Sequence, residues 1–575
     1  MKSKKLAEFY EEASSTTKRL EKIKILSKFL KELSENDRDV MYLLLGDIYP
    51  EYSEKRIGIS NQLAIKAISK ATGIGSKQVT KEWKLIGDLG KVAEKLTKKK
   101  KQATLHTAQT LTTKKVLENL RKLPELEGKG TVGKKLSLIT ELLSSATPIE
   151  ALYLIRTLIG DLRIGIKEST VRESMALAFF PGLDKDGKKK AAKKIQDAID
   201  RTNDLAAVFD IVRKKKLESL DKLPLQVGKP IKAMLAQKVN TIADGFKVVG
   251  KPCAIEYKYD GFRLLIHKKD KEVILFTRRL ENVTNQFPEV VEYVQKYVSG
   301  KSFILDSEAV GFDKKTKEYK PFQSVSQRIR RKYHIEKLQK ELPIEVNVFD
   351  IIYYEGKPQL DEPFEKRTAL IKKIIKNHPY KIVHSKGIIT DSEKQAKKFY
   401  KKALADNQEG IMLKNLKAEY QPGSRVGHML KIKPEERDLD LVITGAEYGT
   451  GKRSGWLSSF ILSCRDGNKG EYLEIGKVGT GIKEKTEEGT SFEELTKELT
   501  PYIIEEKGKS VKIKPKLVVS VTYQEIQKSP NYNSGFALRF PRLTVLRPDK
   551  SIKEIATPEE IKKDFENQKR NWRYG

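Results

Sequence analysis

Apolar residues in the first part of the chain recur at steps of three and four positions. Between Leu20 and Leu30 they stand at positions 20, 23, 26, 29 and 30, which is the spacing of one buried stripe on a helix. The same period runs from Ala151 to Phe180, and few glycines or prolines interrupt the region. The pattern predicts an all-helical domain over residues 1–228.

The pattern changes near Pro224 and Pro230, and from Cys253 onward short alternating or β-branched runs replace the helical period. Such runs predict strands, and the clearest lie at residues 273–276, 303–305, 345–352 and 410–414. A helical pattern at residues 365–376 stands between two of them. We therefore expect an α+β domain with antiparallel strands over residues 229–433.

A charged, hinge-like stretch at Pro434–Asp438 marks a second boundary. Beyond it, short strand patterns at residues 441–443, 459–463 and 516–523 are separated by glycine-rich turns. The length and strand spacing of residues 434–575 favour a small β-barrel such as an OB-fold.

The composition is strongly basic. The 575 residues include 113 Lys and Arg against 78 Asp and Glu, a formal net charge of +35. A chain this cationic attracts polyanions, and nucleic acid is the first candidate. A thermophile-like charged surface is the alternative, but balanced ion pairs alone would not leave so large an excess. Lysine runs at residues 98–101, 188–190 and 214–216 are either solvated loops and helix flanks or a phosphate-tracking surface.

The cysteine content and the distribution of apolar residues argue against zinc-binding, disulfide-rich, secreted and membrane-spanning proteins. The two cysteines, Cys253 and Cys464, cannot form a four-cysteine zinc site or a disulfide framework, and they fit a reducing compartment. The N-terminus runs into a charged helical pattern without an apolar core, so we expect no signal peptide. No stretch reaches the ~18 apolar residues that a membrane helix needs. We expect a soluble cytoplasmic protein with no membrane partner.

The segment Glu256–Arg263 is the strongest candidate for chemistry. Strand alternation sends its three charged residues at 256, 258 and 260 to one side of the chain and its two tyrosines to the other. Gly261 then allows a close approach to a ligand or a positive φ. Lys258 is a phosphate clamp, or a nucleophile once burial or nearby cations lower its pKa of about 10.4, or an ordinary strand-end lysine in a surface salt bridge.

Further acids and bases follow at strand ends, in an order that suggests a polyphosphate site. Glu308 and Glu409 are candidate Mg²⁺ ligands, and Phe349 offers a face on which a base can stack. Each segment alone is more often an ordinary strand with solvated charges. Together they match the needs of phosphoryl or nucleotidyl transfer, in which negative charge must be neutralised, and the candidate cations are Arg263, Arg425, Lys431 and Lys433.

Seven motifs in this order resemble the ATP-dependent DNA ligases of the archaeal and eukaryotic replicative type. The likeness covers nearly the whole chain, because the helical region, notably residues 160–165, also resembles the DNA-binding domain of that family. The motifs are KYDGFR at 258–263, FTRRLENVT at 276–284, LDSE at 305–308, VFDIIYYEG at 348–356, EGIMLK at 409–414, LKIK at 430–433 and LRFPRLTVLRPDK at 538–550.

The resemblance implies a role for each matching residue. Lys258 is then the adenylated nucleophile, Glu256 contacts adenine and Phe349 stacks on it. The remaining positions are implied to be Arg263 and Arg278 on the nucleotide or the 5′-phosphate, Glu308 near the ribose and the metal, Glu409 as a metal ligand, Arg425 near the phosphates, Lys431 on the α-phosphate with Lys433 beside it, and Arg539, Arg542 and Lys550 orienting pyrophosphate. Two positions depart from the family pattern, Met429 where an aromatic residue is common and Ser307 where glycine is frequent.

The resemblance also implies the activity and its partners. We expect a nucleoid-associated, monomeric enzyme that uses ATP and Mg²⁺, with Mn²⁺ as a substitute, to seal nicks in double-stranded DNA during replication, recombination and repair. If the C-terminal cations serve only the first step, that domain must later swing about the Pro434–Asp438 hinge. The segment Gln102–His106 resembles a weak sliding-clamp peptide, although a flexible polar loop explains it equally well.

Four other functions share parts of this pattern. An RNA-capping guanylyltransferase or an RNA ligase also uses a KxDG lysine, but the helical region and the RFPR segment disfavour both. An NAD-dependent ligase would carry a four-cysteine zinc site, which this chain cannot supply. The fourth alternative is a non-catalytic DNA-binding protein in which the nucleotide motifs serve only as scaffold. Covalent labelling with ATP distinguishes the two, because only the enzyme retains label.

Overall fold

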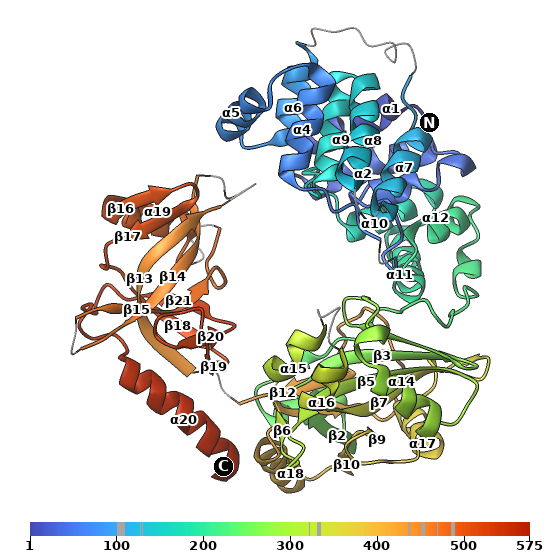
Figure 1. Ribbon diagram of the computed structural model, residues 1–575. Coiled ribbons are helices and arrows are strands. Elements are labelled where there is room, and N and C mark those ends of the chain that lie inside the picture. Colours follow the sequence, from blue (N-terminus) through green and yellow to red (C-terminus); the bar gives the residue numbers. More distant parts are fainter. Residues whose placement is uncertain are drawn as a thin grey trace.

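The protein consists of a helical unit, a mixed α+β unit and a strand-rich unit with a final helix, in that order along the chain (Figure 1). This confirms the predicted multidomain class. The structure is a computed structural model that describes residues 1–53, 55–99, 110–126, 128, 130–320, 322–329, 335–434, 437–449, 453, 455–467, 470–484 and 489–574. The expected clamp segment Gln102–His106 lies outside these residues.

The helical unit has one continuous apolar core. The predicted stripe of α2 is buried at Ile23, Leu26, Phe29 and Leu30, but Leu20 is 71% exposed. The stripe therefore begins one turn later than predicted. The helices are α1 (Ser3–Ser14), α2 (Arg19–Lys31), α3 (Val40–Leu43), α4 (Asn61–Thr72), α5 (Ser76–Ile86), α6 (Leu89–Thr97), α7 (Thr113–Lys122), α8 (Thr131–Ser145), α9 (Pro148–Leu158), α10 (Glu168–Phe179), α11 (Lys185–Thr202) and α12 (Leu205–Arg213).

Two details of the predicted helical pattern are wrong. The period over Ala151–Phe180 does not mark continuous helix, because α9 ends at Leu158 and α10 begins only at Glu168. Between them the backbone has positive φ at positions 160, 163 and 165, which a right-handed helix excludes. The lysine run at 188–190 lies within α11 and does not flank it.

Two sheets form the α+β unit. One has the strand order β1-β12-β11-β2-β10, and the other has β4-β3-β5-β7-β8 with β6 on β5 and β9 on β7. The pairings are antiparallel as predicted, except for β1 with β12 and β7 with β9. The strands are β1 (Gln237–Lys238), β2 (Cys253–Lys258), β3 (Phe262–Lys269), β4 (Glu272–Thr277), β5 (Ser302–Phe312), β6 (Tyr319–Lys320), β7 (Ile344–Tyr354), β8 (Lys357–Pro358), β9 (Ile382–His384), β10 (Gly387–Thr390), β11 (Gly410–Lys414) and β12 (Met429–Ile432).

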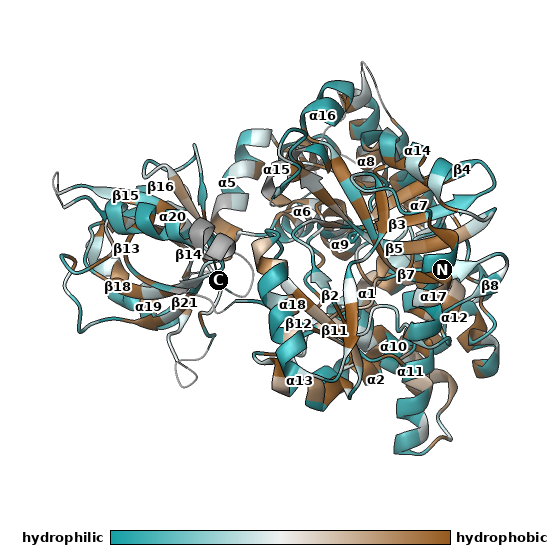
Figure 2. Cartoon of the chain, turned by 90° about the horizontal axis from the view of Figure 1, so that it is seen from below, coloured by the Kyte–Doolittle hydropathy of each residue, from teal (hydrophilic) through white to brown (hydrophobic). Residues whose placement is uncertain are grey.

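Strand alternation decides which face of the first sheet is buried. Ile255 and Tyr257 of β2 pack with Ile411 and Leu413 of β11 into a core beneath α13 (Ile242–Val249) and α18 (Glu393–Ala405). The second sheet packs its outer face against α14 (Pro288–Tyr297) and α17 (Phe364–Ile374). Figure 2 shows β3 and β5 in apolar colour, whereas α11 and α18 are mainly hydrophilic. The opposite faces of the two sheets meet through a smaller apolar cluster that includes Leu265, Ile304 and Met429, and beside it they carry polar side chains.

The C-terminal unit is organised around the long strand β13 (Arg437–Tyr448). This strand pairs with β14 (Leu457–Arg465) on one side, and with β17 (Ser510–Ile513) and β18 (Val518–Tyr523) on the other. The remaining elements are β15 (Tyr472–Val478), α19 (Phe492–Leu499), β16 (Ile503–Lys507), β19 (Glu525–Lys528), β20 (Phe536–Arg539), β21 (Arg542–Leu546) and α20 (Pro558–Tyr574). Within the described chain, no helix is long and apolar enough to cross a membrane.

A buried histidine links the first two units and makes stability depend on pH. His267 of β3 is fully buried, and its Nδ1 accepts a hydrogen bond of 3.1 Å from the backbone N–H of Gly228. Burial lowers the pKa of His267 from 6.5 to about 3. The stability that the neutral ring provides is therefore present above pH 6.5 and is lost as the pH falls from 6.5 towards 3.

We expect the wild-type chain to lose about 1 kcal/mol more unfolding free energy than His267→Gln between pH 6.5 and 5.5, because the ring takes up a proton over this interval in the unfolded chain, where it is half protonated at pH 6.5, and stays neutral in the folded one. Urea titrations read by hydrogen exchange of β3 peptides measure the difference. His378→Gln, at a half-buried ring, is the matched control. Equal pH slopes for wild type and His267→Gln would contradict the assignment.

Candidate active site between the two sheets

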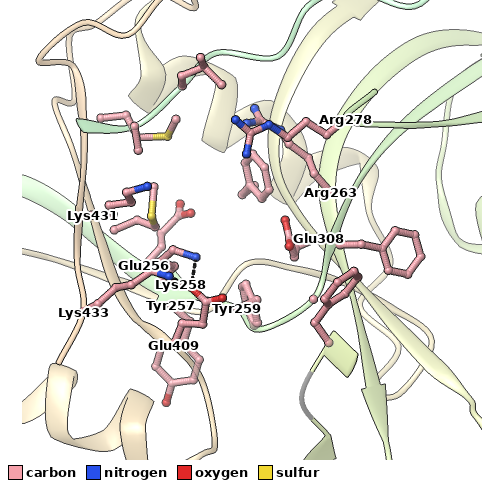
Figure 3. A pocket seen from close by; sticks show the side chains of 18 of the residues that line it. Glu256, Tyr257, Lys258, Tyr259, Arg263, Arg278, Glu308, Glu409, Lys431 and Lys433 are labelled. Atoms are coloured by element: carbon pink, nitrogen blue, oxygen red, sulfur yellow. Dashed lines mark ion pairs between the residues drawn. The ribbon is translucent and has the colours of Figure 1, made fainter. Parts of the chain in front are cut away.

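The polar faces of the two sheets enclose a cavity of about 500 Å³ (Figure 3). The C-terminal unit supplies Arg539 and Phe540 to its lining, and the other lining residues come from the α+β unit. Eleven predicted site residues line it together: Glu256, Lys258, Arg263, Arg278, Glu308, Phe349, Glu409, Arg425, Lys431, Lys433 and Arg539.

The first sheet places its pocket residues by register. Met412 of β11 lies opposite Glu256 of β2 on one side and opposite Lys431 of β12 on the other. Lys258 stands two residues beyond Glu256 on the same strand, so both point to the same face. The predicted alternation of charged and aromatic residues in this segment is confirmed, with Tyr257 and Tyr259 both buried in the apolar core.

Gly261 has a specific steric reason to be glycine. A Cβ atom at this position would lie 2.2 Å from the carbonyl oxygen of Ala309 in β5. The close approach predicted for Gly261 is therefore made to a neighbouring strand, and its φ is not positive. This contact brings the end of β2 against β5 and so sets Lys258 near Glu308.

The carboxylate of Glu409 holds two lysines. It forms an ion pair with Lys258 and lies 2.5 Å from the ammonium of Lys433, and Figure 3 shows the three side chains converging. Burial raises the pKa of Glu409, but the positive charges of the two lysines outweigh burial and hold this pKa well below its usual range. Burial and the charge of Lys258 lower the pKa of Lys433.

Two other acids of the pocket have raised pKa values. Burial raises the pKa of Glu308 to about 8, against the opposing charges of Lys258 and Arg263. Asp260 is 1% exposed, and burial together with the charge of Glu409 raises its pKa. Strongly perturbed carboxyl groups gathered in one cleft are typical of a functional site.

Glu308 and Glu409 fit a hard divalent cation. Both carboxylates line the cavity beside Lys258, and Mg²⁺ is commonly held by one or two carboxylates together with substrate phosphates and water. Among the described residues, no group of three or more His, Cys, Asp or Glu side chains forms a complete metal cage. The donor set therefore suits an ion that is held partly by a bound triphosphate.

Arg263 has structural partners that the sequence did not indicate. Its guanidinium donates to Asp306 Oδ1 at 2.8 Å and to the backbone oxygen of Met234 at 2.7 Å. It also lies 3.4 Å from the hydroxyl of Tyr420 and 5.3 Å from the ring centre of Phe349. Arg263 thus ties β3, β5 and the segment before β1 together, and its contact with a nucleotide remains a prediction.

Lys414 is the last residue of the EGIMLK motif, and the sequence alone assigns it no role. Its ammonium lies 2.7 Å from Glu256 Oε2, and the side chains are 5% and 8% exposed. The ammonium also lies over the rings of Phe349 and Phe364, at 4.7 and 4.6 Å from their centres. The pair holds Glu256 in place. In the sequence, the one hint is a lysine at a strand position that alternation places on the polar face, where a buried charge needs a partner.

The three predicted C-terminal cations are not brought together. Arg539 enters the pocket, 3.6 Å from Asp260 Oδ1 and 3.0 Å from Glu525 Oε1. Arg542 is exposed on β21, and Lys550 pairs with Asp440 at 2.5 Å within the C-terminal unit. Neither Arg542 nor Lys550 lines the cavity.

Comparison with known proteins shows the family. The chain matches "DNA ligase N terminus" over residues 2–176, "ATP dependent DNA ligase domain" over residues 233–433, and "ATP dependent DNA ligase C terminal region" over residues 453–550. A DNA ligase of Nanoarchaeum equitans is 44% identical over 571 residues, with 99% of each chain covered. The chain belongs to the ATP-dependent DNA ligase family. It is therefore an enzyme that seals nicks in DNA with ATP.

Further comparisons agree with this membership. A DNA ligase of Thermococcus onnurineus is 39% identical over 571 residues and is covered to the same extent. The solved structure named "Pmar-Lig_PreS3" has a TM-score of 0.57 with this ligase and covers 94% of it and 99% of its own chain. The identity is 18%, so this likeness concerns the fold alone.

We expect Lys414→Met to lower the unfolding free energy of the ligase by about 3–5 kcal/mol, because it leaves the Glu256 carboxylate buried without its charged partner. Denaturant titrations measure the change. The double variant Glu256→Gln with Lys414→Met should recover part of the loss, since no lone charge remains. Lys397→Met, which breaks an exposed pair with Glu393, is the control, and a loss below about 1 kcal/mol in Lys414→Met would contradict the prediction.

Proposed function

We propose that this ligase seals nicks in duplex DNA through Lys258, which takes an adenylyl group from ATP and passes it to the DNA. The observation that carries the proposal is the position of Lys258, paired with Glu409 in a cavity that also contains Glu308. A nucleophilic lysine, two carboxylates for a divalent cation and further cations for phosphate oxygens are the parts that nucleotidyl transfer requires.

The first step forms the covalent intermediate. Lys258 first gives up the proton that it holds in the ion pair with Glu409. Its neutral amine then attacks the α-phosphorus of ATP, a P–N bond forms as the nitrogen releases a second proton to solvent, the α–β phosphoanhydride bond breaks, and pyrophosphate leaves. Mg²⁺ held by Glu308 and Glu409, or Mn²⁺ in its place, would neutralise the developing negative charge. Lys431, Lys433 and Arg425 line the same cavity and are assigned to the phosphates.

Two further transfers complete the reaction. An oxygen of the 5′-phosphate at the nick attacks the phosphorus of lysyl-AMP, so that the P–N bond breaks and the amine of Lys258 leaves with a proton. The 3′-hydroxyl then attacks the activated 5′-phosphate, a phosphodiester bond forms and AMP is released. The covalent route divides one difficult displacement into easier ones.

The remaining pocket residues are assigned to binding. Glu256, held by Lys414, contacts the adenine, and Phe349 stacks on its face. Arg263 contacts the nucleotide from its position between Asp306 and Phe349, and Arg278 reaches the nucleotide or the 5′-phosphate. Orientation of pyrophosphate is assigned to Arg539, Arg542 and Lys550. The support is strongest for Arg539, because it alone of the three lines the cavity.

The finer domain assignment belongs to the same proposal. Residues 1–228 bind DNA, residues 229–433 carry out adenylation, and residues 434–575 form an OB-fold. On one side, β13 pairs with β18 along its first half and with β17 along its second half. On the other side, its register against β14 shifts twice. Both features support a curled, barrel-like sheet. We assign the ligase to the cytoplasm near the nucleoid, as a monomer, with a sliding clamp as partner through Gln102–His106.

Covalent labelling tests the central step. With α-labelled ATP and Mg²⁺, the wild-type chain should retain label that Lys258→Ala loses completely, because no other residue replaces the amine. Salt-sensitive DNA binding should persist in Lys258→Ala, since one pocket lysine contributes little to phosphate contacts. Lys269→Ala, at an exposed position of β3, is the matched control. A non-catalytic DNA-binding protein would retain no label in any variant.

The contact between Arg539 and Asp260 generates a prediction about motion. It joins the C-terminal unit to the pocket, and DNA must occupy the same side of the site in the later steps. A disulfide engineered between the two units beside this contact, with Arg539 and Asp260 both kept, should leave adenylation near the wild-type rate and reduce nick sealing at least tenfold, measured before and after reduction. Unimpaired sealing by the oxidised protein would defeat the hinge hypothesis.

A further inference from the structure

A half-buried ion cluster lies where the helical unit meets the α+β unit. The ammonium of Lys232 is 3.1 Å from Glu51 Oε2, 2.9 Å from Glu168 Oε2 and 3.2 Å from Asp200 Oδ1. The three acids come from separate parts of the helical unit: the segment before α4, the start of α10 and the last turns of α11. Lys232 itself lies in the segment that leads into β1. One lysine therefore joins three parts of one unit to the entry of the next.

Backbone hydrogen bonds extend this cluster to a loop of the active site. The N–H of Lys232 donates to the carbonyl of Asp200 at 3.1 Å, and the N–H of Gly423 donates to the carbonyl of Lys232 at 3.3 Å. Leu235 donates from its N–H to the carbonyl of Ser424 at 2.9 Å. The segment around Lys232 is thus held between α11 and the loop Tyr420–Arg425.

Gly423 brings that loop directly against Asp200. Its φ is +67°, and a Cβ atom there would lie 2.6 Å from Cγ of Asp200. No other residue fits between the carboxylate and the loop without a shift of one of them. Two residues further on, Arg425 lines the active-site cavity, so the position of its backbone follows from this contact.

A second cavity connects the cluster to the pocket. It has a volume of about 220 Å³ and is lined by Glu51, Lys232 and Gly423 as well as by Leu235 and Arg278. The last two residues also line the active-site cavity. The cavity beside the cluster and the nucleotide pocket therefore share wall residues.

The charges show which member of the cluster keeps it together. Burial raises the pKa of Asp200 to about 6 despite the nearby ammonium of Lys232. Burial lowers the pKa of Lys232, and the three carboxylates outweigh this and raise it. Without the ammonium, three carboxylates would repel one another in a half-buried site, and of these three only Glu168 and Asp200 would keep a shared donor, the amide of Gln196 at 2.7 and 2.9 Å.

We propose that Lys232 and Asp200 are positioning residues for nucleotidyl transfer: by holding the loop Tyr420–Arg425 against the helical unit, they set the place of Arg425 beside the triphosphate. The inference rests on the proposed function, in which Arg425 serves the phosphates of ATP. It gives the helical unit a part in the adenylation step, before any DNA is bound.

The test measures self-adenylation of the full-length chain against ATP concentration, without DNA. Lys232→Met should raise the apparent KM for ATP roughly tenfold, because a displacement of about 1 Å in a phosphate-binding group has effects of this order or larger. The matched control is Lys194→Met, the same substitution at an exposed ion pair of α11 with Asp221, which should leave KM unchanged. Lys232→Arg should restore most of the wild-type value.

A double variant separates positioning from a general loss of stability. If Lys232 acts through Arg425, Lys232→Met should add no further increase in KM to Arg425→Ala. Additive effects, or a wild-type KM in folded Lys232→Met, would overturn the inference. Should Lys232→Met fail to fold, the variant Gly423→Ala replaces it in the test, because the added methyl group displaces the loop while Lys232 remains. An unchanged KM for ATP in Gly423→Ala would also overturn the inference. Absence of label on the wild-type chain would instead refute the proposed function.

Discussion

The active site depends on one carboxylate that holds two ammonium groups close to each other. Glu409 pairs with Lys258 and Lys433, and without its charge the two lysines would repel each other across the same small space. Under the proposed function, a triphosphate and a divalent cation would change this balance, because phosphate oxygens can pair with the lysines and the cation can bind the carboxylate. The three side chains are thus partners placed within reach of one another.

The two-sheet architecture makes this concentration of charge tolerable. Odd-numbered residues of β2 and β11, such as Ile255 and Ile411, fill an apolar core, and their even-numbered neighbours reach the cavity. Charged groups therefore face the cavity and one another, while their backbones lie in the sheet. The close approach of Gly261 to Ala309 joins this sheet to the one that carries Glu308, so a local steric requirement fixes the distance across the pocket.

Much of this was predictable from the sequence because it follows from local periodicity and motif order. The strand at Gly410–Lys414 and the alternation around Lys258 are confirmed, and eleven of the predicted site residues line one cavity, although their roles stay predictions. The misses concern contacts between distant segments. Nothing local shows that Lys414 meets Glu256 or that Arg263 meets Asp306, and the positive φ values that separate α9 from α10 leave the apolar period intact. Arg542 and Lys550 stand in the same motif as Arg539, but strand direction and the pairing with Asp440 keep them from the cavity.

Arg539 and Phe540 complete the lining of the pocket only while the C-terminal unit contacts the α+β unit, and this gives the Arg539–Asp260 pair its importance. The pair spans 3.6 Å, so it is a weak attachment compared with the bonds inside either unit. Asp260 is buried and has a raised pKa, so the approach of a cation stabilises its charged form. The departure of Arg539 removes that cation and favours uptake of a proton. If the C-terminal unit swings away as the hinge hypothesis holds, that movement and protonation of Asp260 are therefore linked.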